Sequence, residues 1–109
     1  MNMPTILVAT WEDGLFAISG DSRTQQWAGQ TVPWIAADGR GGALAIIDGH
    51  SLRRRVAGGE WVTLATSEFD LSCCMAVRGA IYVGTNDARM LQLNEGGTLE
   101  PMDDRKSVV

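Results

Sequence analysis

A short string of residues recurs three times along the chain at nearly equal intervals. Ile6-Leu-Val-Ala-Thr10 matches Ala80-Ile-Tyr-Val-Gly-Thr85 so that Val8 aligns with Val83, an offset of 75 residues. Half of this offset predicts a middle copy, and Leu44-Ala-Ile-Ile-Asp48 lies 38 residues after the first copy and 37 before the third. A fixed period in this range indicates stacked structural repeats. We therefore expect three copies of one supersecondary unit.

Each copy is predicted to consist of short strands separated by turns. In the middle copy, apolar runs at residues 34–37, 43–47, 52–57 and 61–65 alternate with Gly-containing turns. The same pattern predicts strands at 6–10, 15–19 and a segment ending near 27 in the first copy, and at 71–77, 80–85, 90–94 and 98–102 in the third. Four strands every ~40 residues are typical of a β-propeller blade. We predict an all-β fold of about three four-stranded antiparallel blades, with a β-sandwich as the alternative.

The predicted blades do not complete a ring. We expect a first blade at residues 5–28 that lacks its innermost strand, a second at 33–66, a third at 71–103, and the start of a further innermost strand at 107–109. An open stack of blades exposes large apolar faces and unpaired edges. Two arrangements would cover them: further blades in a longer chain, or a second copy that closes a six-bladed ring, the C-terminal strand of each copy completing the other's first blade.

Charge and hydropathy exclude several classes of protein. Nine basic residues against thirteen acidic ones give a formal net charge of −4, whereas nucleic-acid-binding proteins carry a basic surplus because phosphate contacts supply much of their affinity. The sequence has no apolar run long enough to span a membrane, and no signal peptide is recognisable at its start. We therefore expect a cytoplasmic protein that binds neither nucleic acid nor a membrane.

The two cysteines are adjacent, which restricts their chemistry. Side chains of Cys73 and Cys74 would point to opposite faces of a strand, so an ordinary disulfide is not available and a reducing compartment fits best. A metal site would need further Cys or His ligands, and the single histidine, His50, lies in a predicted turn. We predict inert thiols and neither a metal nor a cofactor.

Two segments resemble a known family. Residues 6–19 (Ile-Leu-Val-Ala-Thr-Trp-Glu-Asp-Gly-Leu-Phe-Ala-Ile-Ser) and their weaker echo at 81–94 resemble the sialidase-type repeat propellers, a broad group of WD40-like and BNR-like repeat proteins. Members often carry a Ser-x-Asp-x-Gly-x-Thr-Trp box between the third and fourth strands, and residues 19–27 are a degenerate version of it. The resemblance covers nearly the whole chain and implies a propeller fold, but a repeat specifies fold far better than function.

The resemblance also implies what a catalytic member needs: three arginines around a carboxylate, a tyrosine nucleophile with a glutamate partner, and an aspartate acid. Arg53, Arg54 and Arg55 are consecutive, so on a strand they alternate between faces and cannot converge. Tyr82, the single tyrosine, lies inside a predicted strand. We expect no catalytic residue. Arg54 is predicted to find a carboxylate or carbonyl partner in an apolar layer, or to reach solvent through a one-residue bulge.

Binding residues are predicted on one face of the propeller, where the turns between second and third strands and the connections between blades open together. This acidic rim is predicted to receive a cation or a basic partner, with solvated turn chemistry as the alternative. Trp11 and Trp34 are candidate aromatic platforms near this face, whereas Trp27 and Trp61 are expected to pack between blades. The rim carboxylates are Glu12, Asp13, Asp48, Glu68, Asp70, Asp87, Asp103 and Asp104, and the main candidates among them are Glu12, Asp13, Asp48 and Asp87.

Three functions of different class remain open. We expect a non-catalytic binding or scaffold module, or a fragment of a longer propeller protein, because the catalytic set is missing. One alternative is part of a sialidase-like glycoside hydrolase whose catalytic residues lie outside this chain. The other is a lectin-like oligomer that stacks a sugar on Trp11 or Trp34.

Overall fold

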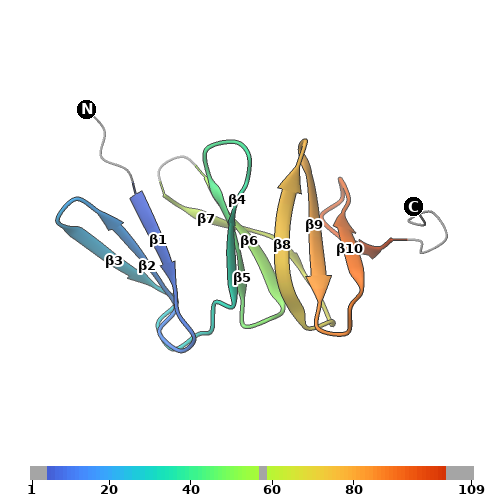
Figure 1. Ribbon diagram of the computed structural model, residues 1–109, viewed down its shortest axis with the longest axis horizontal. Helices are drawn as coiled ribbons and strands as arrows, with labels where there is room; N and C mark the ends of the chain where they lie inside the picture. The colour runs from blue at the N-terminus through green and yellow to red at the C-terminus, as the bar shows by residue number, and fades with distance from the viewer. Residues whose placement is uncertain (1–4, 57–58, 103–109) are drawn as a thin grey trace.

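The computed structural model describes residues 5–56 and 59–102 (Figure 1). Within these ranges the chain forms eleven strands and no helix, arranged in three antiparallel sheets of three, four and four strands. The predicted all-β fold is thereby confirmed, and none of the three sheets closes on itself. The strand predicted at 107–109 lies outside the described residues.

Each sheet is a meander in which strands that follow one another in the chain lie side by side. The first sheet contains β1 (Thr5–Ala9), β2 (Leu15–Ser19) and β3 (Ser22–Gln26). The middle sheet contains β4 (Trp34–Ala37), β5 (Ala43–Ile47), β6 (Ser51–Arg55) and β7 (Trp61–Thr66). The third sheet contains β8 (Leu71–Val77), β9 (Ala80–Thr85), β10 (Met90–Leu93) and β11 (Leu99–Pro101).

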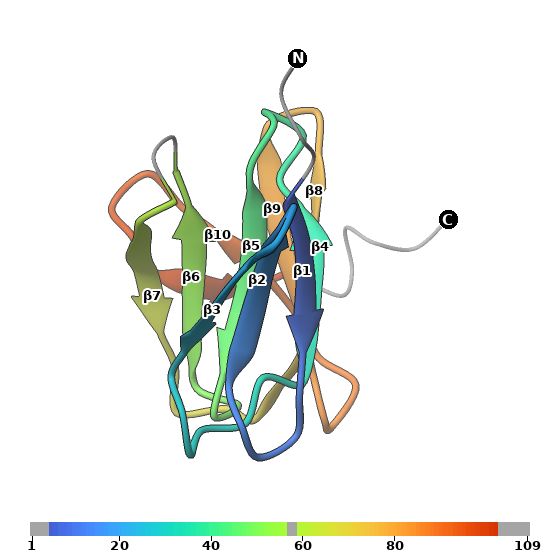
Figure 2. The ribbon, with the colours of Figure 1, turned by 90° about the vertical axis from the view of Figure 1, so that its left-hand side faces the viewer.

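The three sheets are stacked face to face in chain order, as Figure 2 shows in a view through the stack. Strand β5 lies at the centre, and all five of its residues are buried. Its Ala45 belongs to an apolar cluster with Leu15 of the first sheet, and its Ile46 belongs to a second cluster with Val83 of the third. Because successive side chains of a strand point to opposite faces, this uninterrupted apolar strand serves both interfaces.

The hairpins of the three sheets correct the alignment of the repeat. The amide of Thr10 donates to the carbonyl of Gly14 at 2.9 Å. The amide of Thr85 donates to the carbonyl of Arg89, also four residues further along the chain, at 3.0 Å. Ile47 pairs in the same way with the residue four positions further on. Ile47 therefore lies 37 residues after Thr10 and 38 before Thr85, and the predicted order of 38 and then 37 is wrong by one residue.

This one-residue correction changes which side chains share a face, because strand side chains alternate. In the corrected alignment, Val8, Ala45 and Val83 occupy equivalent positions of their sheets. Ala45 faces the first sheet, and Val83 faces the middle sheet. We call the face directed at the preceding sheet the N-side face and the opposite one the C-side face. Val8 lies on the N-side face of the first sheet, since its neighbour Leu7 packs toward the middle sheet. The three sheets thus repeat in one orientation.

One edge of the stack, at the bottom of Figure 1, gathers the β1–β2, β5–β6 and β9–β10 turns and both connections between sheets. We call this the loop edge; it comprises residues 10–14, 27–33, 48–50, 67–70 and 86–89. Each connection is tied to the turn before it and the turn after it by backbone hydrogen bonds of 2.7–3.0 Å. The donor and acceptor pairs are Val32 and Thr10, Asp48 and Thr31, Ser67 and His50, and Asn86 and Asp70.

The described residues contain no helix of the length and apolar character that crossing a bilayer requires.

Candidate functional site: the acidic loop edge

Most charged side chains of the loop edge are carboxylates. The predicted carboxylates that fall within the described residues all lie in its turns and connections, whereas Asp103 and Asp104 lie outside the described residues. Turn geometry explains this placement, because Asp accepts local hydrogen bonds where the backbone has no strand partner. The edge carboxylates are Glu12, Asp13, Asp48, Glu68, Asp70 and Asp87.

A shallow hollow of about 240 Å³ lies between the second connection and the β9–β10 turn, lined by Glu68, Phe69, Asp70, Asn86 and Asp87. Its carboxylates come from two segments that are far apart in sequence. The backbone hydrogen bond from the amide of Asn86 to the carbonyl of Asp70, at 2.8 Å, holds the two segments together.

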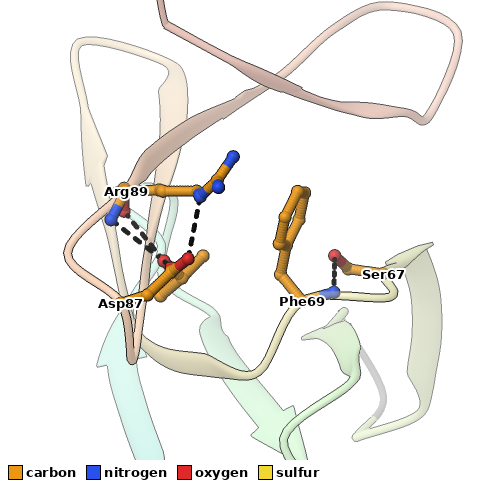
Figure 3. Close-up of polar contacts among 5 residues, drawn as sticks. Ser67, Phe69, Asp87 and Arg89 are labelled. Atoms are coloured by element: carbon orange, nitrogen blue, oxygen red, sulfur yellow. Dashed lines mark hydrogen bonds and ion pairs between the residues drawn. The ribbon is translucent and has the colours of Figure 1, made fainter.

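Figure 3 shows how one guanidinium is held beside this hollow. The Nε of Arg89 donates to a carboxylate oxygen of Asp87 at 2.8 Å, and the guanidinium carbon lies 5.1 Å from the centre of the Phe69 ring. The hydroxyl of Thr85 donates to the other Asp87 oxygen. The hydrogen bonds from Thr85 and Arg89 hold the pKa of Asp87 below its ordinary value, so this carboxylate is ionised at neutral pH.

His50 anchors the second connection from the side of the β5–β6 turn. Its Nδ1 lies 3.2 Å from the carbonyl oxygen of Ser67 and 3.1 Å from that of Phe69, and its Nε2 lies 3.4 Å from a carboxylate oxygen of Asp70. The imidazole therefore bridges a turn and a connection while its side chain stays 51% exposed.

The four main candidate carboxylates lie on the same edge but in three separate turns. Asp48 accepts hydrogen bonds from the amide of Thr31 at 2.8 Å and from the side chain of Gln30 at 2.7 Å, so it fastens the first connection. Glu12 and Asp13 are exposed in the β1–β2 turn. Glu68 and Asp70 line the hollow together with Asp87. Both are predicted on the acidic rim, but neither is among its four main candidates.

The four tryptophans lie in different surroundings, and the expected packing of Trp27 and Trp61 between sheets is confirmed. Trp27 and Trp61 meet edge to face, with ring centres 4.9 Å apart, in the cluster between the first and middle sheets. Trp11 is 70% exposed in the β1–β2 turn. The indole N–H of Trp34 donates to the carbonyl of Cys74 at 3.0 Å, so this side chain contacts the third sheet. Trp11 is therefore the freer aromatic surface of the two candidates.

The three consecutive arginines diverge, as strand alternation predicts. Arg54 donates from Nε to Asp38 at 2.9 Å, and Arg53 lies over the Trp27 ring. The side chain of Asp38 is only 3% exposed and that of Arg54 is 26% exposed. Asp38 also accepts the amides of Arg40 and Gly42 at 2.7 and 2.8 Å, which closes the β4–β5 turn. Sequence reasoning missed Asp38, although Arg54 signalled that a buried partner was needed.

The pKa of Asp38 reflects two opposing effects. Burial by itself raises the pKa, but the backbone donors Arg40 and Gly42 and the guanidinium of Arg54 outweigh it, so the pKa lies below its ordinary value. The carboxylate is therefore ionised in the interior of the turn.

The cysteines are free, and Cys74 is buried against the middle sheet while Cys73 is half-buried. Burial, with a smaller effect of neighbouring Cys73, raises the pKa of Cys74 to about 12. Because the thiolate is the reactive form, Cys74 is inert at neutral pH.

We expect the Cys74 thiol to resist alkylation until the protein unfolds. In a Cys73→Ser background, iodoacetamide at pH 8 is expected to label the protein only after denaturant is added. The ordinary thiol pKa of 9.0 is below the folded value of about 12, so the contribution of the neutral thiol to stability is full below pH 9.0 and declines toward pH 12. Rapid alkylation of the folded protein would contradict the burial of Cys74.

Among residues 5–56 and 59–102, no group of three His, Cys, Asp or Glu side chains is arranged to hold a metal ion. Comparisons of the chain with family models, with curated proteins and with solved structures find no match.

Proposed function

We propose that this chain is a non-catalytic binding module built from β-propeller blades, of the sialidase-type repeat class that its repeated segments resemble. The proposal is supported by the fact that the three stacked meanders have the same orientation. In propellers, successive blades present equivalent loops on one side, and such loops on a rigid scaffold commonly form binding surfaces. The loop edge, with its turns and connections held by repeated backbone hydrogen bonds, fits this role.

The partner that fits the loop edge is a basic protein surface. The observation that supports this choice is the environment of Arg89, whose guanidinium lies between the carboxylate of Asp87 and the ring of Phe69. Glu68 and Asp70 add two further carboxylates to the same hollow. A lysine or arginine side chain from a partner would pair with the carboxylates of Glu68 and Asp70, which Arg89 does not contact.

Removing two of the three carboxylates that line the hollow is expected to weaken binding of a basic probe by about tenfold. Each exposed ion pair contributes up to about 1 kcal/mol, and about 1.4 kcal/mol corresponds to tenfold in affinity. The variant Glu68→Gln/Asp70→Asn removes two carboxylates without touching the Asp87–Arg89 pair. Binding of a fluorescein-labelled hexa-arginine peptide, followed by fluorescence anisotropy at low and high salt, measures the effect.

The matched control for this experiment is Asp21→Asn/Glu95→Gln, which changes the net charge equally at turns outside the loop edge. We expect the control to bind the peptide within about twofold of the wild type, because exposed charges beyond a Debye length are screened. Equal losses in the two variants would mean that the peptide responds only to net charge, and the proposed site would be wrong.

A second candidate function, carbohydrate binding, is favoured by the exposure of Trp11 alone. An exposed indole can stack on the apolar face of a sugar ring. A glycan array probed with the wild type and with Trp11→Ala tests this alternative: a glycan signal that Trp11→Ala abolishes supports it, and no signal from the wild type rejects it.

A further inference from the structure

The N-side face of the first sheet presents apolar side chains against which no other described sheet packs. Ile6 pairs with Ile18 and Val8 pairs with Phe16, so these four side chains lie together on β1 and β2. Val8 is 40% exposed, and Ile6 is exposed as well. Monomeric proteins rarely leave a contiguous apolar face of this kind open to water.

The chain buries the same positions elsewhere, in the third sheet. With the offset of 75 residues, Val8 and Phe16 correspond to Val83 and Leu91, which are fully buried against the middle sheet. Ile6 and Ile18 correspond likewise to Ile81 and Leu93, which pack on the same cluster. The open face of the first sheet therefore has the composition of an interface that is already formed inside the molecule.

The C-side face of the third sheet is the matching open surface. Its exposed side chains include Met75, Val77 and Met90, and Tyr82 lies between them, paired with Met75. With the offset of 38 residues, Tyr82 and Met90 occupy the positions of Leu44 and Leu52, which receive the third sheet in the internal interface.

Charge supports a contact between these two faces. Arg23 lies on the N-side face of the first sheet, paired with Ile18 and placed over the Phe16 ring at 5.1 Å. Glu100 lies on the C-side face of the third sheet, on β11, beside Gln92. Both charged residues belong to the outermost strand of their sheet, so face-to-face stacking in the common orientation brings opposite charges together.

We propose that a second copy of this chain covers both open faces, head to tail. The N-side face of the first sheet of each copy receives the C-side face of the third sheet of the other, and a two-fold axis makes the two contacts identical. Each contact continues the order and orientation of the stacking inside one chain. The proposal depends on these faces alone and is independent of what the loop edge binds.

Two face variants test the proposal through the mass of the protein in solution. Val8→Glu places a charge on the N-side face of the first sheet, and Met75→Glu places one on the C-side face of the third sheet; Met75 is 52% exposed. Sedimentation equilibrium is expected to give twice the protomer mass of 11.7 kDa for the wild type and the protomer mass for each variant alone. Val62→Glu, at a site 46% exposed in the middle sheet, serves as the matched control and is expected to remain a dimer.

An equal mixture of the two face variants distinguishes the head-to-tail contact from other dimers. The Val8→Glu copy keeps an intact third sheet and the Met75→Glu copy an intact first sheet, so one native contact re-forms and a one-to-one complex is expected. Circular dichroism establishes that each variant is folded. A monomeric wild type, a larger assembly, a mixture that stays monomeric, or a dimer of folded Met75→Glu alone would each overturn the proposal.

Discussion

Replacing Gly14 with alanine is expected to lower the free energy of unfolding by about 3 kcal/mol, of which about 1 comes from the left-handed backbone and about 2 from overpacking. Gly14 has a φ of +72°, and an added Cβ would lie 2.0 Å from the carbonyl oxygen of Gln26 and 2.3 Å from that of Trp27. Both obstacles are backbone atoms that cannot rotate away. The added methyl group therefore forces the start of β2 away from the end of β3, at the point where the connection to the middle sheet begins.

Gly29→Ala is the matched control for this prediction. Gly29 has a similar φ of +83°, but no heavy atom lies within 4 Å of its added Cβ. We expect a loss of about 1 kcal/mol from the backbone conformation alone. Urea unfolding of both variants, followed by circular dichroism, measures the difference; equal losses would show that the close approach at Gly14 is relieved without cost.

Replacing Arg54 with methionine is expected to lower the free energy of unfolding by about 2 kcal/mol, because it leaves a buried carboxylate without its charged partner. Methionine keeps the apolar stem of the side chain and removes only the guanidinium. The expected loss is smaller than for a fully buried pair, since Arg54 is partly exposed and Asp38 keeps its two backbone donors. The same urea unfolding measurement applies.

The neighbouring arginine provides the control for the Arg54 substitution. Arg55→Met removes a guanidinium from the same strand at a position with no hydrogen-bonded carboxylate among the described residues, and we expect a change within about 0.5 kcal/mol. Asp38→Asn/Arg54→Met is expected to lose less than the sum of its single changes, because the two side chains are coupled. Additive losses would contradict a direct interaction between Asp38 and Arg54.

The ion pair between Asp38 and Arg54 also affects how the protein unfolds in acid. The pKa of Asp38 lies below its ordinary value of 3.8 in the folded protein, so its contribution to stability is present above pH 3.8 and is lost as the pH falls through the folded value. Removing the Arg54 guanidinium raises that folded pKa. We expect the acid-unfolding midpoint of Arg54→Met to move to higher pH, whereas that of Arg55→Met stays unchanged.

Local signals in the sequence account for much of the fold. Gly-bearing turns between short apolar runs predict strands such as 43–47, 71–77 and 80–85 at the positions where the structure has them. Turn residues and the alternation of apolar and polar side chains act over only a few residues, so both signals can be recognised in the sequence alone. The propeller itself remains a prediction, because three stacked sheets do not make up a ring. The strand at 107–109 also remains one, because it lies outside the described residues.

The register of the middle copy could not be derived in this way. Thr10 directly follows β1 and Thr85 ends β9, but the middle copy has Ile47 at the equivalent position, followed by Asp48-Gly49. Matching residues by apolar character therefore shifts the alignment by one. In a strand that is buried on both faces every residue is apolar, so the pattern holds no information about which face each side chain takes.

The candidate site depends on contacts between distant segments, which local patterns do not encode. Asp38 is 16 residues from Arg54 and looks like any turn aspartate in the sequence. Phe69 and Arg89 are brought together only when the connection before β8 folds against the β9–β10 turn. Sequence reasoning could place the carboxylates on one edge, but only the structure shows which of them line one hollow.

The repeating orientation of the three sheets is the central claim, and methyl NOE spectroscopy tests it most directly. The corrected register predicts cross-peaks from Ile46 to Val83 and Leu91 in the third sheet, and from Ala45 to Leu15 in the first. The register derived from the sequence alone would reverse these partners. Cross-peaks from Ile46 to Leu15, with none to Val83, would contradict the common orientation of the sheets.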